Sequence, residues 1–246
     1  MRAIVFDLGH TIIDFGPAED ALRDAYSQVL TLLRATASAE IPSAEHLIER
    51  VTYRIFNEIN ASYLRQELEE LDILRLFDAA LHDLGFRLDA ATILQIAELE
   101  HRALSTGMVL PESNRDTIAQ LHAEGFKIGL VSNVTLLPHL MREDMARLGL
   151  LDYFDVTVFS SEEMIRKPHP RIYQVVLERL EVAAAEATFV GDRLKEDVRG
   201  PKEAGMRAVL TTQFRHEDPS EAEVRPDGVV TSLAELPDIL ARWQGR

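Results

Sequence analysis

The sequence predicts an α/β fold in which a parallel sheet with helices on both faces is interrupted, straight after its first strand, by an all-helical insert. Three observations predict it. Short apolar runs typical of buried strands open the chain and recur in its second half. Helical patterns separate those later runs, which indicates βαβ units and a parallel sheet. The long stretch after the first run shows helical periodicity and almost no strand signal.

The strands of the sheet are expected at five short apolar runs, several of them partly β-branched. These runs are Arg2–Phe6, Lys127–Val131, Val156–Phe159, Thr188–Val190 and Arg207–Leu210. A helix is predicted over Pro111–Ala123, because Gly125 follows it as a stop signal. A second is predicted over Pro170–Leu180, where Pro170 suits the first turn and the apolar residues share one face.

The insert is expected to be a small bundle of four helices joined by short connections. One amphipathic pattern runs from Ala21 to Leu33, and a second begins at Pro42. The third covers Leu71–Leu84 before Gly85, and the fourth covers Ala90–Leu104. We therefore expect an α/β core domain formed by residues 1–16 and 106–246, and a helical cap domain formed by residues 17–105.

Composition narrows the classes of function. The 246 residues carry 41 Asp and Glu against 26 Lys and Arg, a formal charge of −15. This acidity argues against a nucleic acid or an anionic membrane as partner, since both require a basic face. The absence of cysteine excludes disulfides, zinc–thiolate sites and a cysteine nucleophile. No apolar run is long enough for a membrane span or a signal peptide, so a cytoplasmic protein is expected.

Polar side chains follow the predicted strands, where ligands bind in open α/β sheets. The residues are Asp7, Ser132, Asn133, Lys167, Asp192 and Asp197. A carboxylate nucleophile, a hydroxyl, a lysine and an acidic pair in one crevice favour phosphoryl transfer. A carboxylate and a phosphate dianion repel each other, so a divalent cation must bridge them, and Mg²⁺ prefers such oxygen ligands.

Four segments, in order, resemble the motifs of the haloacid dehalogenase-like hydrolase superfamily. They are IVFDLGHTII, GLVSN, RKPHP and VGDRLKED. The resemblance extends from Arg2 to about Thr212, and it implies a Rossmann-like core. The helical insert lies where this superfamily carries its helical cap, which suggests the subfamily of haloacid dehalogenases, phosphoglycolate phosphatases and β-phosphoglucomutases.

By this resemblance, Asp7 is the nucleophile and Ser132 binds the phosphoryl group, helped by backbone amides near Asn133. Lys167 neutralises charge on the nucleophile and on the phosphate. The resemblance also implies one Mg²⁺, held by Asp7, by the backbone carbonyl of Gly9, by Asp192, and by Asp197 directly or through water.

One residue departs from the superfamily's first motif. Gly9 stands where a second Asp is usual, and the side chain of that Asp serves as general acid and base. Such a group contributes about 10²–10⁴ in rate. His10 is the nearest candidate to replace it, because an imidazole can give or take a proton, although a small structural substitution is the simpler interpretation.

We therefore expect a Mg²⁺-dependent phosphatase that acts on a small phosphorylated metabolite. Two alternatives stay open. A 2-haloacid dehalogenase would attack carbon without a metal, although such enzymes usually carry an aromatic residue at the position of Gly9. A catalytically impaired binding or regulatory protein on the same scaffold is supported by Gly9 alone. The oligomeric state is not predicted.

Overall fold

The computed structural model describes residues 1–36, 41–221 and 223–245. The chain forms two compact units. We call Met1–Phe15, Val109–Val134 and Arg142–Arg246 the core unit, and Gly16–Met108 with Thr135–Met141 the helical unit. The predicted cap, 17–105, includes residues 37–40, which lie outside the described residues. That the two expected segments fold as separate domains stays a prediction.

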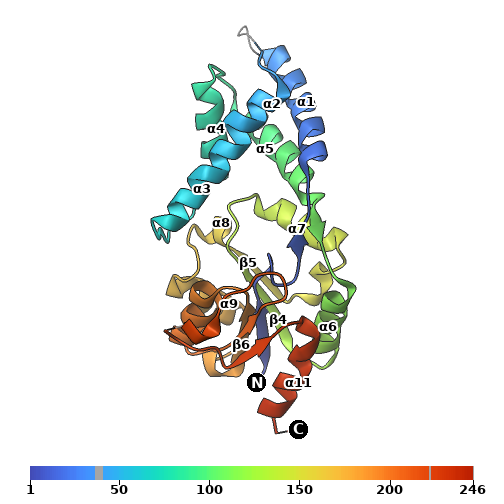
Figure 1. Cartoon of the computed structure of the whole chain (residues 1–246), viewed down its shortest axis with the longest axis vertical. Helices are drawn as coiled ribbons and strands as arrows, with labels where there is room; N and C mark the ends of the chain where they lie inside the picture. Colours follow the sequence, from blue (N-terminus) through green and yellow to red (C-terminus); the bar gives the residue numbers. More distant parts are fainter. Residues whose placement is uncertain (37–40, 222, 246) are drawn as a thin grey trace. The chain divides into compact units, whose positions relative to one another are not determined.

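The core unit contains a six-stranded parallel sheet in the order β5–β4–β1–β6–β7–β8. Figure 1 labels β4, β5 and β6 of this sheet. Its strands are β1 (Ala3–Phe6), β4 (Lys127–Ser132), β5 (Val156–Phe159), β6 (Ala187–Gly191), β7 (Arg207–Thr211) and β8 (Gly228–Val230). The predicted α/β class and the five predicted strands are confirmed. Every residue of β1 and β6 is buried, which explains why the strands appear in the sequence as continuous apolar runs.

Helices pack on the sheet of the core unit. Ala3 and Val5 of β1 share a buried cluster with Ile172 and Val176 of α9. Since side chains alternate along a strand, Ile4 points to the other face. The α- and π-helices lying wholly in this unit are α6 (Glu112–Ala123), α8 (Ser160–Glu163), α9 (Pro170–Leu180), η4 (Leu194–Arg199), α10 (Gly200–Glu203) and α11 (Leu236–Trp243). The helix predicted over Pro170–Leu180 is confirmed, and α6 ends before Gly125 at φ +87°, as expected.

Several short elements were not predicted. The sixth strand, β8, has three residues, of which only Val230 is buried, so it carries almost no periodicity. The sequence interpretation also left out α7 (Pro138–Arg147), α8 and α11. The remaining elements are the single-turn helices η2 (Leu151–Tyr153), η3 (Ala184–Glu186), η5 (Pro219–Glu221) and η6 (Leu233–Glu235), and a two-stranded sheet of β2 (Asp14–Phe15) and β3 (Met108–Val109).

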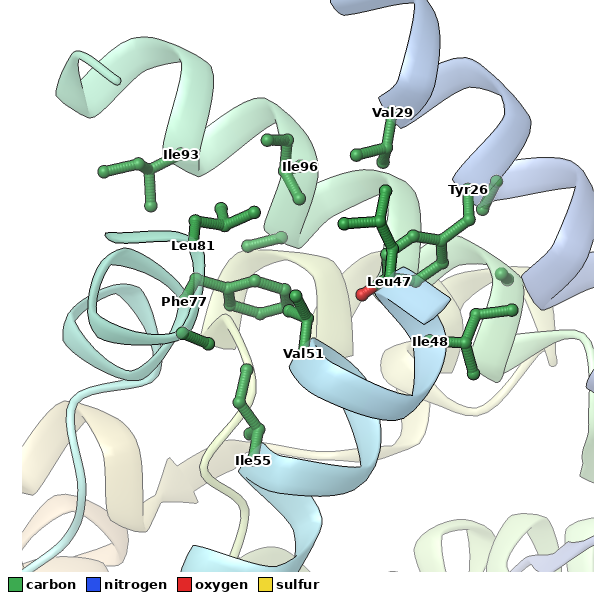
Figure 2. Close-up of a cluster of buried hydrophobic side chains, with 14 of the residues drawn as sticks. Tyr26, Val29, Leu47, Ile48, Val51, Ile55, Phe77, Leu81, Ile93 and Ile96 are labelled. Carbon is green, nitrogen blue, oxygen red and sulfur yellow. The ribbon is translucent and has the colours of Figure 1, made fainter. Parts of the chain in front are cut away.

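The helical unit contains the four predicted helical segments. They are α1 (Glu19–Thr36), the continuous α2–η1–α3 (Ala44–Leu47, Ile48–Tyr53, Arg54–Leu64), α4 (Ile73–Asp83) and α5 (Ala90–Ser105). Figure 2 shows apolar side chains from all four meeting in one cluster, with Tyr26 of α1, Val51 of η1, Phe77 of α4 and Ile96 of α5 among them. Asp72 and Asp89 cap the last two helices, which accounts for where those helices begin.

Glu100 is a buried acid inside this apolar cluster. Its Oε2 accepts hydrogen bonds of 2.5 Å from both Tyr26 Oη and Thr52 Oγ1. Burial raises the pKa of Glu100, an effect that these two hydrogen bonds oppose. Thr52 lies within the π-helical turn η1, so the irregular turn and the buried polar group occur together. Within the described parts of the chain, no helix combines the length and hydrophobicity that crossing a bilayer requires.

Candidate active site

The predicted site residues gather at one edge of the sheet. Asp7 directly follows β1, Ser132 ends β4, and Asp192 directly follows β6. Because β1 lies between β4 and β6 and all three run parallel, their carboxyl ends meet at the same edge. Lys167, in the loop before α9, completes the group, since it contacts Asp7. Residues separated by up to 185 positions are thus brought together by strand order.

Lys167 connects two of the acids. Its Nζ lies 2.7 Å from Asp7 Oδ1 and 2.8 Å from Asp197 Oδ1, and its side chain is 2% exposed. Burial alone would lower the pKa of Lys167, but the charges of Asp197 and Asp7 outweigh burial and raise it. The lysine is therefore protonated throughout the physiological range and supplies a fixed positive charge beside Asp7.

Asn133 holds the backbone of Lys167 in place. The side-chain amide of Asn133 donates to the Lys167 carbonyl oxygen at 3.0 Å, and its Oδ1 accepts from Lys167 N at 2.7 Å. These paired bonds fix the backbone of the loop at Lys167, and the Lys167–Pro168 peptide that follows is cis. The side chain of Asn133 is thus engaged with the Lys167 backbone, which leaves the backbone amides near Asn133 for the role in phosphate binding that the resemblance implies.

Three carboxylates form a compact buried group. Asp7, Asp192 and Asp197 each offer an oxygen, and these oxygens lie within 4.8 Å of one another. Asp197 Oδ2 also accepts from the backbone N–H groups of Asp192 at 3.1 Å and Arg193 at 3.0 Å. Burial raises the pKa of Asp197 to about 7, with Lys167 opposing the rise and the charges of Asp7 and Asp192 adding to it. Three N–H donors nevertheless favour the ionised carboxylate.

Gly191 makes room for Asp197. A Cβ on Gly191 would collide with the side chain of Asp197, so a glycine is required at the end of β6. Asp197 in turn binds the backbone of the loop that carries Asp192. The spacing of Gly191, Asp192 and Asp197 in the sequence therefore has a steric and hydrogen-bonding reason.

Thr11 is a site residue that the sequence analysis missed. It is fully buried, and its Oγ1 lies 3.4 Å from Asp7 Oδ2 and 3.3 Å from Asp192 Oδ1. One hydroxyl proton serves one acceptor at a time, so Thr11 connects the two acids without neutralising either. Its place in the first motif, four residues after Asp7, was a signal that could have been used.

Arg215 is the second residue that was missed. Its Nε lies 3.2 Å from Asp192 Oδ2, although the geometry is not that of a hydrogen bond. Burial and the charge of Asp7 raise the pKa of Asp192, and Arg215 acts against them. Arg215 belongs to the loop after β7, outside every motif, so the sequence offered no signal for it.

Comparisons with known proteins agree with this geometry. The model of the haloacid dehalogenase-like hydrolase family matches residues 1–205. A glyceraldehyde 3-phosphate phosphatase of Methanopyrus kandleri is 30% identical, over 98% of this chain and 97% of its own. A phosphoglycolate phosphatase of Yersinia pseudotuberculosis is 27% identical, over 96% and 91%. The crystal structure of a 2-haloacid dehalogenase from Pseudomonas syringae matches with a TM-score of 0.69 and 27% identity, over 99% of each chain.

The chain belongs to the haloacid dehalogenase-like hydrolase family. It is therefore a hydrolase, and the resemblance found in its four motifs is confirmed. The family match covers β1, β4 and β6, at whose ends Asp7, Ser132 and Asp192 lie, together with every acid of the group described above.

This hydrolase has an altered turn after Asp7. A Cβ on Gly9 would lie 3.1 Å from Cε2 of Phe15, whose ring fills the space beside Gly9. His10 adopts φ +57°, a left-handed conformation that is uncommon outside glycine. Its Nδ1 lies 2.9 Å from Asp14 Oδ1. An ionised carboxylate only accepts, so Nδ1 carries the proton and Nε2 is the ring nitrogen left for another partner.

The donor set of the hydrolase fits a hard divalent cation. Asp192 Oδ2 is buried and accepts no hydrogen bond, which leaves its lone pairs available. Asp7, Asp192 and Asp197 with Lys167 leave two negative charges in excess when all four groups are ionised. Oxygen ligands and excess negative charge are the conditions under which Mg²⁺ binds.

Proposed function

We propose that this hydrolase is a Mg²⁺-dependent phosphatase of a small phosphorylated metabolite, acting through an aspartyl-phosphate on Asp7. The observation that carries the proposal is the buried contact of Asp7, which follows β1, with Lys167, beside the carboxylates of Asp192 and Asp197. The names of two relatives, a glyceraldehyde 3-phosphate phosphatase and a phosphoglycolate phosphatase, support phosphate esters as substrates.

Asp7 would be the nucleophile. Lys167 holds one of its oxygens at 2.7 Å and Thr11 lies near the other, so the carboxylate is oriented before substrate arrives. Attack forms a bond from Asp7 oxygen to phosphorus and breaks the bond to the ester oxygen. Water then cleaves the acyl phosphate, which releases inorganic phosphate and restores the carboxylate.

Ser132 would donate a hydrogen bond to a phosphoryl oxygen, since it ends β4 next to β1. Backbone amides near Asn133 would add to this binding, and Lys167 would offset the phosphate charge. The hydroxyl and the lysine would both stabilise the negative charge that develops in the transition state.

Asp7, the carbonyl of Gly9 and Asp192 would hold Mg²⁺. When bound, the ion would offset the repulsion between the Asp7 carboxylate and the phosphate. The oxygens of Asp197 already accept three hydrogen bonds. Its contact with the ion would therefore be indirect, through water or through the loop that carries Asp192.

His10 is the candidate for protonating the departing oxygen, because Gly9 has no side chain for that task. Asp14 holds the imidazole with Nδ1 protonated, an arrangement common to histidines that act as acid and base. If His10 does not take this role, substrates whose leaving groups are stable as anions are favoured, such as aryl, acyl and anomeric sugar phosphates.

The nucleophile is tested with Asp7→Asn, using the exposed Asp152→Asn as the matched control. We expect Asp7→Asn to lose turnover of an aryl phosphate and Asp152→Asn to keep it. Brief reaction of the wild type, quenched in acid, should add one phosphoryl group to the peptide containing Asp7. Substantial turnover in a folded Asp7→Asn variant, or full wild-type activity in excess chelator, would refute the proposal.

The role of His10 is tested with phosphate esters of increasing leaving-group pKa. A shallow dependence of kcat/KM that steepens in His10→Ala assigns the acid to His10. A steep dependence in the wild type shows that no acid acts. A shallow dependence that His10→Ala leaves unchanged would contradict both versions and indicate another proton source.

A 2-haloacid dehalogenase is the second candidate, favoured by the structural match at 27% identity. Such an enzyme would release halide from a 2-haloacid, and chelator would not stop it. Halide release without phosphate-ester hydrolysis would select this function. Absence of both activities in the folded protein would indicate an impaired binding protein, which Gly9 alone favours.

A further inference from the structure

Arg215 is a cation that reaches the acid group from a distant loop. Its Nε lies 3.2 Å from Asp192 Oδ2, and the Asp192 side chain is 3% exposed against 29% for Arg215. A second contact anchors the same loop, since Glu217 Oε2 accepts from Leu194 N at 2.7 Å. The loop after β7 is thus attached to the segment after β6 at two points.

Arg215 approaches the carboxylate of Asp192, which a metal would also use. Asp192 Oδ1 is near the Thr11 hydroxyl, at 3.3 Å. Oδ2 is buried and accepts no hydrogen bond of good geometry. Arg215 therefore faces the oxygen of Asp192 that accepts no hydrogen bond, on the same carboxylate that a cation would bind.

The contact of Arg215 with Asp192 changes the charge balance of the acid group. Asp7, Asp192 and Asp197 face one buried cation, Lys167, so negative charge is in excess. Arg215 offsets part of that excess. A divalent ion bound to the same carboxylate would be repelled by the guanidinium, because two cations at one buried carboxylate are poorly screened.

We propose that Arg215 competes with Mg²⁺ for Asp192, and so weakens Mg²⁺ binding while stabilising the acid group when no ion is bound. The proposal rests on the magnesium site of the proposed function. Arg215 would accordingly set the Mg²⁺ concentration at which the hydrolase becomes loaded.

A positioning role for Arg215 would change Mg²⁺ affinity in the opposite direction. If Arg215 mainly orients Asp192, its removal would leave the carboxylate misplaced and would weaken Mg²⁺ binding. The sign of the change in Mg²⁺ affinity therefore separates competition from positioning, and it does so without an activity assay.

The experiment compares Arg215→Gln with Arg225→Gln, which removes the same charge from an exposed position of the same loop. Mg²⁺ is titrated into each metal-free protein by calorimetry, and Tm is measured in chelator and in Mg²⁺. We expect Arg215→Gln to bind Mg²⁺ about tenfold more tightly, a typical coupling between neighbouring sites. Its Tm in chelator should fall, and Mg²⁺ should restore it. Arg225→Gln should change affinity less than about twofold.

Glu217→Gln provides a second variant that leaves both Arg215 and Asp192 intact. Loosening the anchor at Leu194 should shift Mg²⁺ affinity in the same direction by a smaller factor. Weaker or unchanged Mg²⁺ binding in Arg215→Gln, or an equal gain in Arg225→Gln, would overturn the proposal and leave the magnesium site standing. A wild type that binds no Mg²⁺ would overturn both.

Discussion

Replacing Lys167 with Met should lower the free energy of unfolding, and the distances between the charged groups determine by how much. Lys167 Nζ contacts Asp7 at 2.7 Å and Asp197 at 2.8 Å, and it is almost completely buried. Methionine keeps the bulk of the side chain but removes the charge and the donors. The variant leaves three carboxylates whose oxygens lie within 4.8 Å, without their buried cation.

The magnitude follows from these distances. Two unit charges 4.8 Å apart repel by about 3.5 kcal/mol at an effective dielectric constant of about 20. Removing one partner from a buried ion pair costs about 3–5 kcal/mol. We therefore expect Lys167→Met to lower the free energy of unfolding by about 3–5 kcal/mol at pH 8 in chelator.

The loss should depend on pH. The pKa of Asp197 is raised to about 7 even with Lys167 present, and Lys167 lowers it, so the variant has a still higher value. A folded pKa above the unfolded pKa means that stability is present at low pH and is lost as pH rises through the folded value. The difference between wild type and Lys167→Met should accordingly be larger at pH 8 than at pH 5.

The assay is urea unfolding followed by circular dichroism at both pH values, with chelator and with Mg²⁺. Lys202→Met is the matched control, since its exposed ion pair with Asp227 contributes less than about 1 kcal/mol. Mg²⁺ should return part of the stability to Lys167→Met. A loss no larger than that of Lys202→Met, or an equal loss at pH 5 and pH 8, would refute the reasoning.

Two further predictions concern Gly9 and Glu100. Gly9→Asp restores a carboxylate at this position, but its Cβ would lie 3.1 Å from the Phe15 ring. The double variant Gly9→Asp with Phe15→Ala should therefore raise kcat for an alkyl phosphate above that of Gly9→Asp alone, by up to about 10²–10⁴ over the wild type. Equal rates for the single and double variants would contradict this steric reasoning. Burial raises the pKa of Glu100, so wild-type stability should fall as pH rises through that value, while Glu100→Gln should show a flatter dependence. Thermal unfolding from pH 5 to pH 9 measures both slopes, and identical slopes would exclude Glu100 as the cause.

Much of the core could be predicted from local pattern. Strands such as β1 are buried on both faces, so they appear in the sequence as continuous apolar runs. The helix α9 has a proline at its start and one apolar face, and its predicted limits are those observed. Asp7 and Asp192 could be placed in one site because parallel strands share a carboxyl edge.

The partners of the site residues were decided only by the tertiary structure. The side chain of Asn133 could have faced a phosphate or the Lys167 backbone, and the fold selected the backbone. The path of the turn between Gly9 and Phe15 places the Phe15 ring in the space beside Gly9. Arg215 reaches Asp192 because β7 lies next to β6, so the loop after β7 lies beside the residues that follow β6.

The physical reason is the range of the interactions. Periodicity and stop signals report the burial and ends of single elements, because those depend on neighbouring residues in the chain. Contacts such as Lys167 with Asp7 and Arg215 with Asp192 join side chains far apart in sequence. They depend on strand order and loop path together, so the amino-acid sequence determined which groups the site contains, and the tertiary structure determined which of them touch.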